Sequence, residues 1–248
     1  MARVATSKKM QPDTTADDQA EGESPASRHY RRAQRDRGAD TRARLIAAAL
    51  DVFGREGFEG ATTRQIAREA DANLAAIVYH FGGKEELYRA VAEYIVEQTS
   101  GLVGPAMAAA GALEASATVE AARATLLRVI ATYVDVILGA DEAERWARFI
   151  IREQLQPTSA FDVIYGFMGG AHALGVRLVA RILGRSEDDE EVRIRVFAMM
   201  GQILVFRVAH TLVLRRMDWA SIGEEERAAI RRVVLLQVEA ILDSGVRS

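Results

Sequence analysis

The chain of 248 residues contains no cysteine. It therefore lacks a disulfide framework, a thiolate nucleophile and any cysteine-based zinc site. Only four prolines are present, and segments with the strict alternation of apolar and polar residues that marks strands are scarce. Alanine, leucine, arginine and glutamate, which favour helices, are abundant. These features predict an all-α protein.

Two further absences concern location. Residues 1–27 contain no apolar segment of the kind that a secretory signal peptide needs, so we expect a cytoplasmic protein. One nearly apolar run, residues 196–214, is nineteen residues long, which is enough for a membrane span. Gln202, Arg207 and His210 interrupt it, and an arginine in mid-bilayer is costly. We favour a helix buried by its own core on one side and by a partner subunit on the other, and predict no membrane association.

The net charge of −3 gives no indication of nucleic-acid binding, but the distribution of charge does. Residues 28–44 carry only two acidic side chains, Asp36 and Asp40, against seven arginines: Arg28, Arg31, Arg32, Arg35, Arg37, Arg42 and Arg44. Such a segment can form a basic arm on DNA phosphates or in the minor groove. It can equally be a solvated tail without contacts, and the sequence leaves both possibilities open.

Residues 62–84 have the pattern of two short helices joined by a tight turn. Thr62 can cap the first helix, with Gln65 reaching back to the Thr62 amide in a capping box, and Asn73 can cap the second. The apolar faces consist of Ile66, Ala67 and Ala70 in the first helix and of Ile77 and Phe81 in the second. This pattern is typical of a helix-turn-helix, whose second helix enters the major groove of DNA.

Three motifs extend over residues 40–99. They are Leu45-Ile46-x-Ala48-Ala49-x-x-x-Phe53-x-x-x-Gly57-Phe58, then Thr62-x-x-x-Ile66-Ala67-x-x-Ala70, and Tyr79-His80-Phe81-x-x-Lys84-Glu85-x-Leu87. Together they resemble the N-terminal signature of TetR-type transcriptional repressors. The stretch from Asn73 to Lys84, and less specifically Arg152-Glu153 with Pro157-Thr158 and Ala160-Phe161, is similar to the CecR-like branch.

Two positions depart from the family pattern. Asp71 stands where the turn usually holds glycine, and aspartate tolerates a positive φ less easily. Val78 replaces a residue that is usually polar or tyrosine, which weakens the expectation of direct base reading at this position.

The predicted DNA-binding residues are Thr62, Thr63, Arg64, Asn73, Leu74, Ala75, Ala76, Val78, Tyr79, His80 and Lys84. Leu74, Ala75, Ala76 and Val78 face away from the apolar face of their helix and can contact thymine methyl groups. Arg64 is the best candidate for a polar contact to a base or a phosphate. The resemblance implies that Tyr79, His80 and Lys84 hold phosphates, although Tyr79 and His80 can instead be a packing pair between helices.

We predict three parts of the chain: a disordered, partly basic arm at residues 1–38, a helix-turn-helix domain at 39–100 and a helical effector-binding and dimerisation domain at 101–248. The first helix should begin at Asp40 or Thr41 and end near Gly57. A fourth helix should run over about 84–99 and break at Gly101, Gly104 and Pro105. Further helices are expected over about 117–138, 141–155, 159–184, 189–217 and 224–243.

The predicted function is that of a homodimeric repressor on a palindromic double-stranded DNA operator, released by a small, mainly apolar effector. Residues 189–217 and 224–243 should close the dimer. Candidate effector-binding residues are Phe149, Arg152, Phe161, Tyr165, Met168, His172, Met199 and Phe206, each of which can instead be plain core.

We predict no cofactor, no metal and no enzymatic activity. His172 and His210 lie far apart without a carboxylate at ligand spacing, and no Ser-His-Asp order or glycine-rich phosphate loop occurs. The alternative is an all-helical small-molecule carrier or an enzyme without DNA binding.

Overall fold

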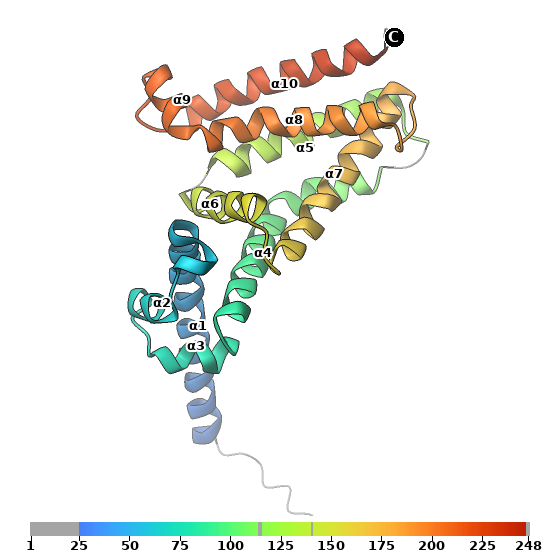
Figure 1. The fold of residues 1–248 in the computed structure, drawn as a ribbon. Helices are drawn as coiled ribbons and strands as arrows, with labels where there is room; N and C mark the ends of the chain where they lie inside the picture. The colour runs from blue at the N-terminus through green and yellow to red at the C-terminus, as the bar shows by residue number, and fades with distance from the viewer. Residues whose placement is uncertain (1–24, 114–115, 140, 247–248) are drawn as a thin grey trace, which may run out of the picture. The chain divides into compact units, whose positions relative to one another are not determined.

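The computed structural model describes residues 25–113, 116–139 and 141–246, and within them the chain forms ten helices and no strand (Figure 1). The prediction of an all-α protein is confirmed for this part of the chain. The contacts divide the chain into two units, residues 1–40 and residues 41–248, and helix α1, Pro25–Gly60, continues from the first into the second. Our expectation of disorder over residues 1–24 lies outside the described residues.

Helix α1 begins earlier than predicted, at Pro25 rather than at Asp40 or Thr41. The expectation that residues 25–38 lack regular structure is therefore wrong. Proline suits the first turn of a helix, and the alanine, arginine and glutamine residues that follow have high helix propensity even without an apolar face. The predicted end near Gly57 is confirmed, because this residue leaves the helical conformation with φ at 77°.

Two short helices follow, α2 over Thr63–Glu69 and α3 over Leu74–Phe81. Both predicted caps form: the Thr62 hydroxyl accepts a hydrogen bond from the Gln65 amide at 3.2 Å, and the Asn73 side chain accepts one from the Ala75 amide at 2.9 Å. The predicted capping box is incomplete, because the Gln65 side chain donates to Glu69 at 3.3 Å. An ionised carboxylate one turn along the helix is the stronger partner for this amide group.

The first hydrophobic core joins α1, α2 and α3 to the helices that follow. Its fully buried members include Leu45, Phe53, Ile66, Ile77 and Leu87. Aromatic rings add directional packing to this core. The Tyr88 ring lies 4.6 Å from Phe53, 5.0 Å from Phe58 and 4.7 Å from Phe149 between centroids. The short helices α2 and α3, which would be marginal alone, are therefore held by tertiary packing.

Helix α4 runs without interruption over Lys84–Gly111 and contains Pro105 in its interior. The predicted break of the helix at Gly101, Gly104 and Pro105 is wrong, since α4 continues across this segment. Packing overrides the local signal here: Val103 and Ala110 are buried, and α4 lies against α5, Val119–Gly139, and α7, Phe161–Leu183.

A second core lies between α5, α7, α8 and α10, with α8 spanning Glu190–Val208 and α10 spanning Glu224–Val246. Fully buried aliphatic side chains from each helix meet in it: Val134, Val179, Ile203 and Leu242. Figure 1 shows α10 beside α8, and both helices contact α5. The first and second cores thus lie within one unit of the chain.

The helix predicted over about 189–217 is two helices. Helix α8 ends at Val208, and α9, His210–Met217, follows at an angle of 75° after a break at Ala209. The nearly apolar run that we weighed as a membrane span is therefore bent in its C-terminal part. Helix α7 is long and apolar enough to cross a membrane by composition, but core helices pass the same test, and α7 packs against α4, α5 and α8.

A buried carboxylate connects α4 with the end of α6, Asp141–Leu155. Glu153 is completely buried and accepts a hydrogen bond from the Tyr88 hydroxyl at 2.6 Å. The Thr158 amide donates to the same carboxylate at 3.2 Å, and the Thr158 hydroxyl lies 3.2 Å from both of its oxygens. Burial and the bond to Glu153 raise the pKa of Tyr88, so its hydroxyl stays protonated and keeps donating.

We predict that Tyr88→Phe lowers the free energy of unfolding by about 2 kcal/mol, because it removes a donor from a buried charged acceptor. Tyr165→Phe is the matched control, since this ring is 63% exposed on α7. Guanidinium chloride unfolding of both variants measures the difference. Equal stability of Tyr88→Phe and the wild type would show that the bond contributes nothing.

Candidate nucleic-acid interface and internal cavity

Helix α3 has one buried and one exposed face. Ile77 is completely buried, whereas Leu74 is 43% exposed, Val78 63% and Tyr79 84%. Ala75 is exposed as well, and Ala76 is half-buried against the first core. The predicted groove-facing residues thus lie on the solvent side of the helix, apart from Ala76. A large exposed aromatic ring with a polar end, such as that of Tyr79, suits contact with a partner more than with water.

Some predicted DNA contacts already have structural roles. The side-chain oxygens of Thr62 and Asn73 are used as helix caps. The Lys84 ammonium lies 4.5 Å from the centre of the Phe58 ring. This is a cation–π distance, and the contact stabilises the observed position of the lysine side chain. Thr63 and His80 are half-buried, and Arg64 is exposed at the start of α2. The His80 ring packs edge-on against Tyr79 at 4.9 Å, but both residues belong to α3, so this contact is not the packing pair between helices that we considered.

Arg44 has a role that our sequence analysis missed. Its guanidinium donates to the Ala70 carbonyl at 2.8 Å and to the Asp71 carbonyl at 2.9 Å. Asp71 has a φ of 47°, the conformation that glycine usually supplies in this turn. Arg44 therefore satisfies carbonyls at the end of α2 and fixes the turn that aims α3. This role could have been predicted, because a helix end leaves carbonyls without helical donors and the arginines of the basic segment can supply them.

The basic segment is therefore divided. Arg44 is bonded within the domain, and the Arg42 guanidinium lies 5.3 Å from the centre of the Phe81 ring. The side chains of Arg28, Arg31, Arg32 and Arg35 lie outside the described side chains. The basic-arm interpretation is thus left with fewer free arginines than the sequence predicts.

Helix α6 holds the C-terminal part of α1. Arg145 pairs with Asp51 at 2.6 Å and donates to the Ala47 carbonyl at 2.8 Å. Arg152 donates to the carbonyls of Gly54, at 2.9 Å, and Arg55. Arg152, a predicted effector-binding residue, is therefore held against α1 in this structure. These carbonyls belong to the last regular turn of α1, where helical partners are missing and an arginine can replace them.

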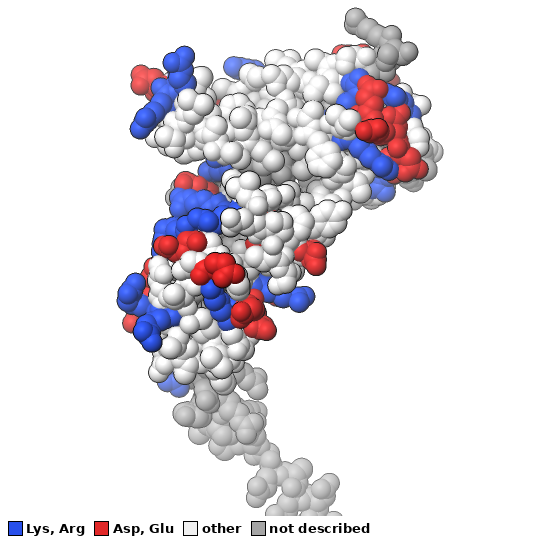
Figure 2. All heavy atoms as spheres, viewed as in Figure 1, with Lys and Arg blue, Asp and Glu red and all other residues white. Residues whose placement is uncertain are grey.

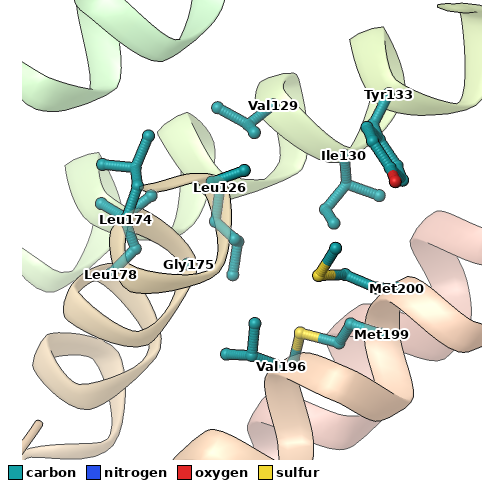
Figure 3. Close-up of a pocket in the computed structure, with 11 residues that line it drawn as sticks. Leu126, Val129, Ile130, Tyr133, Leu174, Gly175, Leu178, Val196, Met199 and Met200 are labelled. Atoms are coloured by element: carbon teal, nitrogen blue, oxygen red, sulfur yellow. The ribbon is translucent and has the colours of Figure 1, made fainter. Parts of the chain in front are cut away.

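An apolar cavity lies between α5, α7 and α8 (Figure 3). Its volume is about 50 Å³, and a second cavity of about 50 Å³ adjoins it toward α4. The two share Val129, Tyr133, Ala171, Leu174 and Met200. Figure 3 shows side chains of α5 and α8 pointing into this space. Burial raises the pKa of Tyr133 to about 12, so its hydroxyl stays protonated and is one of few polar groups at the wall.

Six of the eight predicted effector residues lie elsewhere; only Met168 and Met199 line the cavities. Phe149 is buried in the first core, and Phe161 and Tyr165 pair at the start of α7. His172 stacks on Phe197 at 4.2 Å, and Phe206 packs on the second core. Sequence periodicity places these residues on the correct helices but does not say which of two cores each helix face meets.

Comparison with known proteins agrees with this architecture. The family model described as "Bacterial regulatory proteins, tetR family" matches residues 45–91, and the model described as "HTH-type transcriptional dual regulator CecR, C-terminal domain" matches residues 122–244. The CecR dual regulator of Shigella flexneri is 34% identical over 209 residues, which is 83% of this chain and 93% of that protein. The nicotine-responsive repressor HdnoR of Paenarthrobacter nicotinovorans is 46% identical over 59 residues, 24% of this chain and 30% of that one.

Solved structures share the fold. A TetR-family regulator of Streptomyces coelicolor, SCO4454, superposes with a TM-score of 0.58 at 18% identity, covering 84% of this chain and 97% of that one. FadR of Bacillus subtilis in complex with stearoyl-CoA gives 0.55 at 16% identity, covering 79% and 96%. The matched families and relatives are transcriptional regulators, not enzymes. The chain therefore belongs to the TetR family of transcriptional regulators, with a TetR-type N-terminal domain and a CecR-type C-terminal domain.

Proposed function

We propose that the protein is a cytoplasmic, homodimeric repressor that binds a palindromic operator through α3 and leaves it when an apolar effector enters the cavity. The observation that carries the DNA-binding part is the exposed face of α3, with Leu74, Val78 and Tyr79 in solvent on a helix capped by Asn73. A rigid turn held by Arg44 fixes the direction of this helix. Small and apolar side chains on this face suit thymine methyl groups.

Phosphate contacts flank this helix in the proposal. Lys84 is the first residue of α4, and the two residues that follow it, Glu85 and Glu86, are acidic. It is thus the cation best placed to neutralise a phosphate beside α3, with the Tyr79 hydroxyl as a neutral donor. Arg64, exposed at the start of α2, is the proposed polar base contact.

We predict that Lys84→Ala weakens binding to all operator sequences and lowers the slope of log K against log salt by about one per subunit. Fluorescence anisotropy with labelled operator at several salt concentrations measures both quantities. Arg89→Ala, which removes an exposed arginine paired with Glu93 further along α4, is the matched control and should change neither. An unchanged slope in Lys84→Ala would remove this residue from phosphate contact.

In contrast, Arg64→Ala should change the operator sequence that the protein selects from a pool of DNA fragments.

The proposed dimer surface is an apolar face on α8, α9 and α10. Exposed side chains on it are Ile194, Phe197, Val205, Val208, Leu212, Met217, Val233 and Leu236, each at least 46% exposed. Figure 2 shows a broad uncharged surface over these C-terminal helices. The same helices bury Val196 and Ile203 in the second core, so α8 is apolar on two sides as expected for a helix between a core and a partner. A two-fold packing of α8 and α10 would match a palindromic operator.

We predict that Leu236→Asp converts the dimer into a monomer at micromolar concentration, because it places an unpaired carboxylate in a desolvated interface. Leu155→Asp is the matched control: this leucine is 76% exposed at the end of α6, outside the proposed surface. Sedimentation velocity distinguishes the two states. A monomeric wild type, or a dimeric Leu236→Asp variant, would contradict the proposed surface.

The effector part of the proposal depends on the cavities between α4, α5, α7 and α8. At about 50 Å³ each they are smaller than the several hundred Å³ of ordinary ligand sites, so an effector must enlarge them. Flexible methionines at the wall, Met107, Met168, Met199 and Met200, can move to permit this. FadR in complex with stearoyl-CoA shows that a protein of this fold takes a ligand with a long apolar part.

We predict that Ala171→Leu blocks the effector while leaving operator binding intact, because the larger side chain fills the space shared by the two cavities. Ala173→Leu, two residues on at an exposed position of α7, is the matched control. A thermal-shift screen of apolar metabolites identifies compounds that stabilise the wild type, and operator titration with each compound follows. Compounds that stabilise Ala171→Leu equally would place their site outside the cavities.

A further inference from the structure

A third pocket, different in character from the apolar cavities, lies where α8 bends into α9 and faces α6. Its volume is about 300 Å³. Its charged or polar walls include Glu144, Arg148, Arg207 and His210, and its apolar walls include Ile151 and Leu212. The 75° bend at Ala209 separates α9 from the line of α8 and leaves this space open beside α6.

Arg207 is a desolvated cation. Its Nε and Nη2 atoms both donate to the Ile137 carbonyl, at 3.0 and 2.6 Å. Within the part of the chain that the structure describes, its hydrogen bonds join it to a backbone carbonyl and not to a carboxylate. Burial lowers the pKa of Arg207, which is the direction expected for a cation whose charge is poorly compensated. An arginine in this position gains from an anion that enters the pocket.

Glu144 compensates the charge of Arg207 only in part. Its carboxylate is bound by Arg148 at 2.5 Å, and this bond, with smaller contributions from His210 and Arg207, holds its pKa below the usual range. One carboxylate therefore faces two arginines and a histidine. The pocket carries an excess of positive charge, and the Arg148 side chain, 51% exposed, can turn from Glu144 toward a ligand.

We propose that this pocket binds a small organic carboxylate, with the carboxylate between Arg148 and Arg207 and a small apolar group against Ala147 and Ile151 of α6. Arginine is suited to this because its planar guanidinium presents parallel donors to the two oxygens of a carboxylate. A volume of about 300 Å³ is at the lower end of ligand sites, so the ligand is the size of a single ring with its acid group.

Because the pocket lies on α6, which also holds α1, a ligand bound there can affect DNA binding. Arg145 and Arg152, seven residues apart and hence on one face of α6, bind α1, while Arg148 and Ile151 line the pocket. This effect on DNA binding rests on the proposed function. Binding of the carboxylate to the pocket does not depend on the proposed function, and it is tested separately.

The experiment is isothermal titration calorimetry of the full chain with benzoate, with the neutral isostere benzamide and with inorganic phosphate. We expect saturable binding of benzoate and much weaker binding of the other two. Arg148→Gln and Arg207→Gln should each weaken benzoate binding by about tenfold or more, the loss of one charge-assisted pair. Arg89→Gln is the matched control, an exposed arginine that also has an acidic partner four residues along its helix. Ala171→Leu should leave benzoate binding unchanged.

Several results would overturn the proposal. These are no saturable benzoate binding to the wild type, equal affinity for benzamide or phosphate, unchanged affinity in Arg148→Gln, or loss of binding in Ala171→Leu. If Arg148→Gln leaves benzoate binding unchanged but weakens self-association, the pocket takes a carboxylate of a second copy of this chain. Arg207→Gln also loses the bond to Ile137, so circular dichroism must show it folded; if it is not, Arg148→Gln alone decides.

Discussion

The arrangement of the helices depends on the completely buried carboxylate of Glu153. A buried charge costs several kcal/mol unless its hydrogen bonds are satisfied, and here the donors come from Tyr88 on α4 and from Thr158 just after α6. The end of α6 cannot slide along α4 without leaving this acceptor unpaired. Because the Tyr88 ring also packs against Phe53 of α1 and Phe149 of α6, one side chain ties three helices together. The orientation of the DNA-binding domain is thus fixed partly from outside it.

Helix α1 completes this connection from its own end. Its regular part stops at Gly57, and carbonyls in the last turn before such a break lose helical donors. Arg152 of α6 donates to those of Gly54 and Arg55, while Arg145 pairs with Asp51 one turn earlier. A glycine is needed here for conformation and for space, since φ is 77° and a Cβ atom would lie 3.0 Å from the Arg152 guanidinium. The end of α1 is therefore capped by α6, which belongs to the C-terminal domain.

Local signals in the sequence predicted the helix-turn-helix well because they are set within a few residues. The caps at Thr62 and Asn73 and the buried face of α3 follow from spacing and side-chain chemistry. Signals that depend on tertiary packing failed. Pro105 does not break α4 because buried neighbours hold the helix, and Ala209 bends a run that its composition makes continuous. Most of the predicted effector residues lie outside the cavities for the same reason: a long helix such as α7 meets the first core at Ile164 and the second core at Leu178, and periodicity alone cannot say which core each part meets.

The continuity of α4 has a consequence for the proposed regulation. Val103, Ala106 and Met107 line the cavity from α4, on either side of Pro105, while Tyr88 lies nearer the start of the same helix. Proline lacks the amide that would bond to the Gly101 carbonyl, so the helix is least resistant to bending where the cavity touches it. An effector that enlarges the cavity would bend α4 there and move Tyr88 relative to Glu153. A ligand must prefer one of two states by about 5.5 kcal/mol to carry the equilibrium from 1:99 to 99:1. A smaller preference for the bent helix would already shift the fraction of operator that is occupied. Continuity of α4 makes the coupling mechanical, whereas a flexible joint at the glycines would have absorbed the displacement.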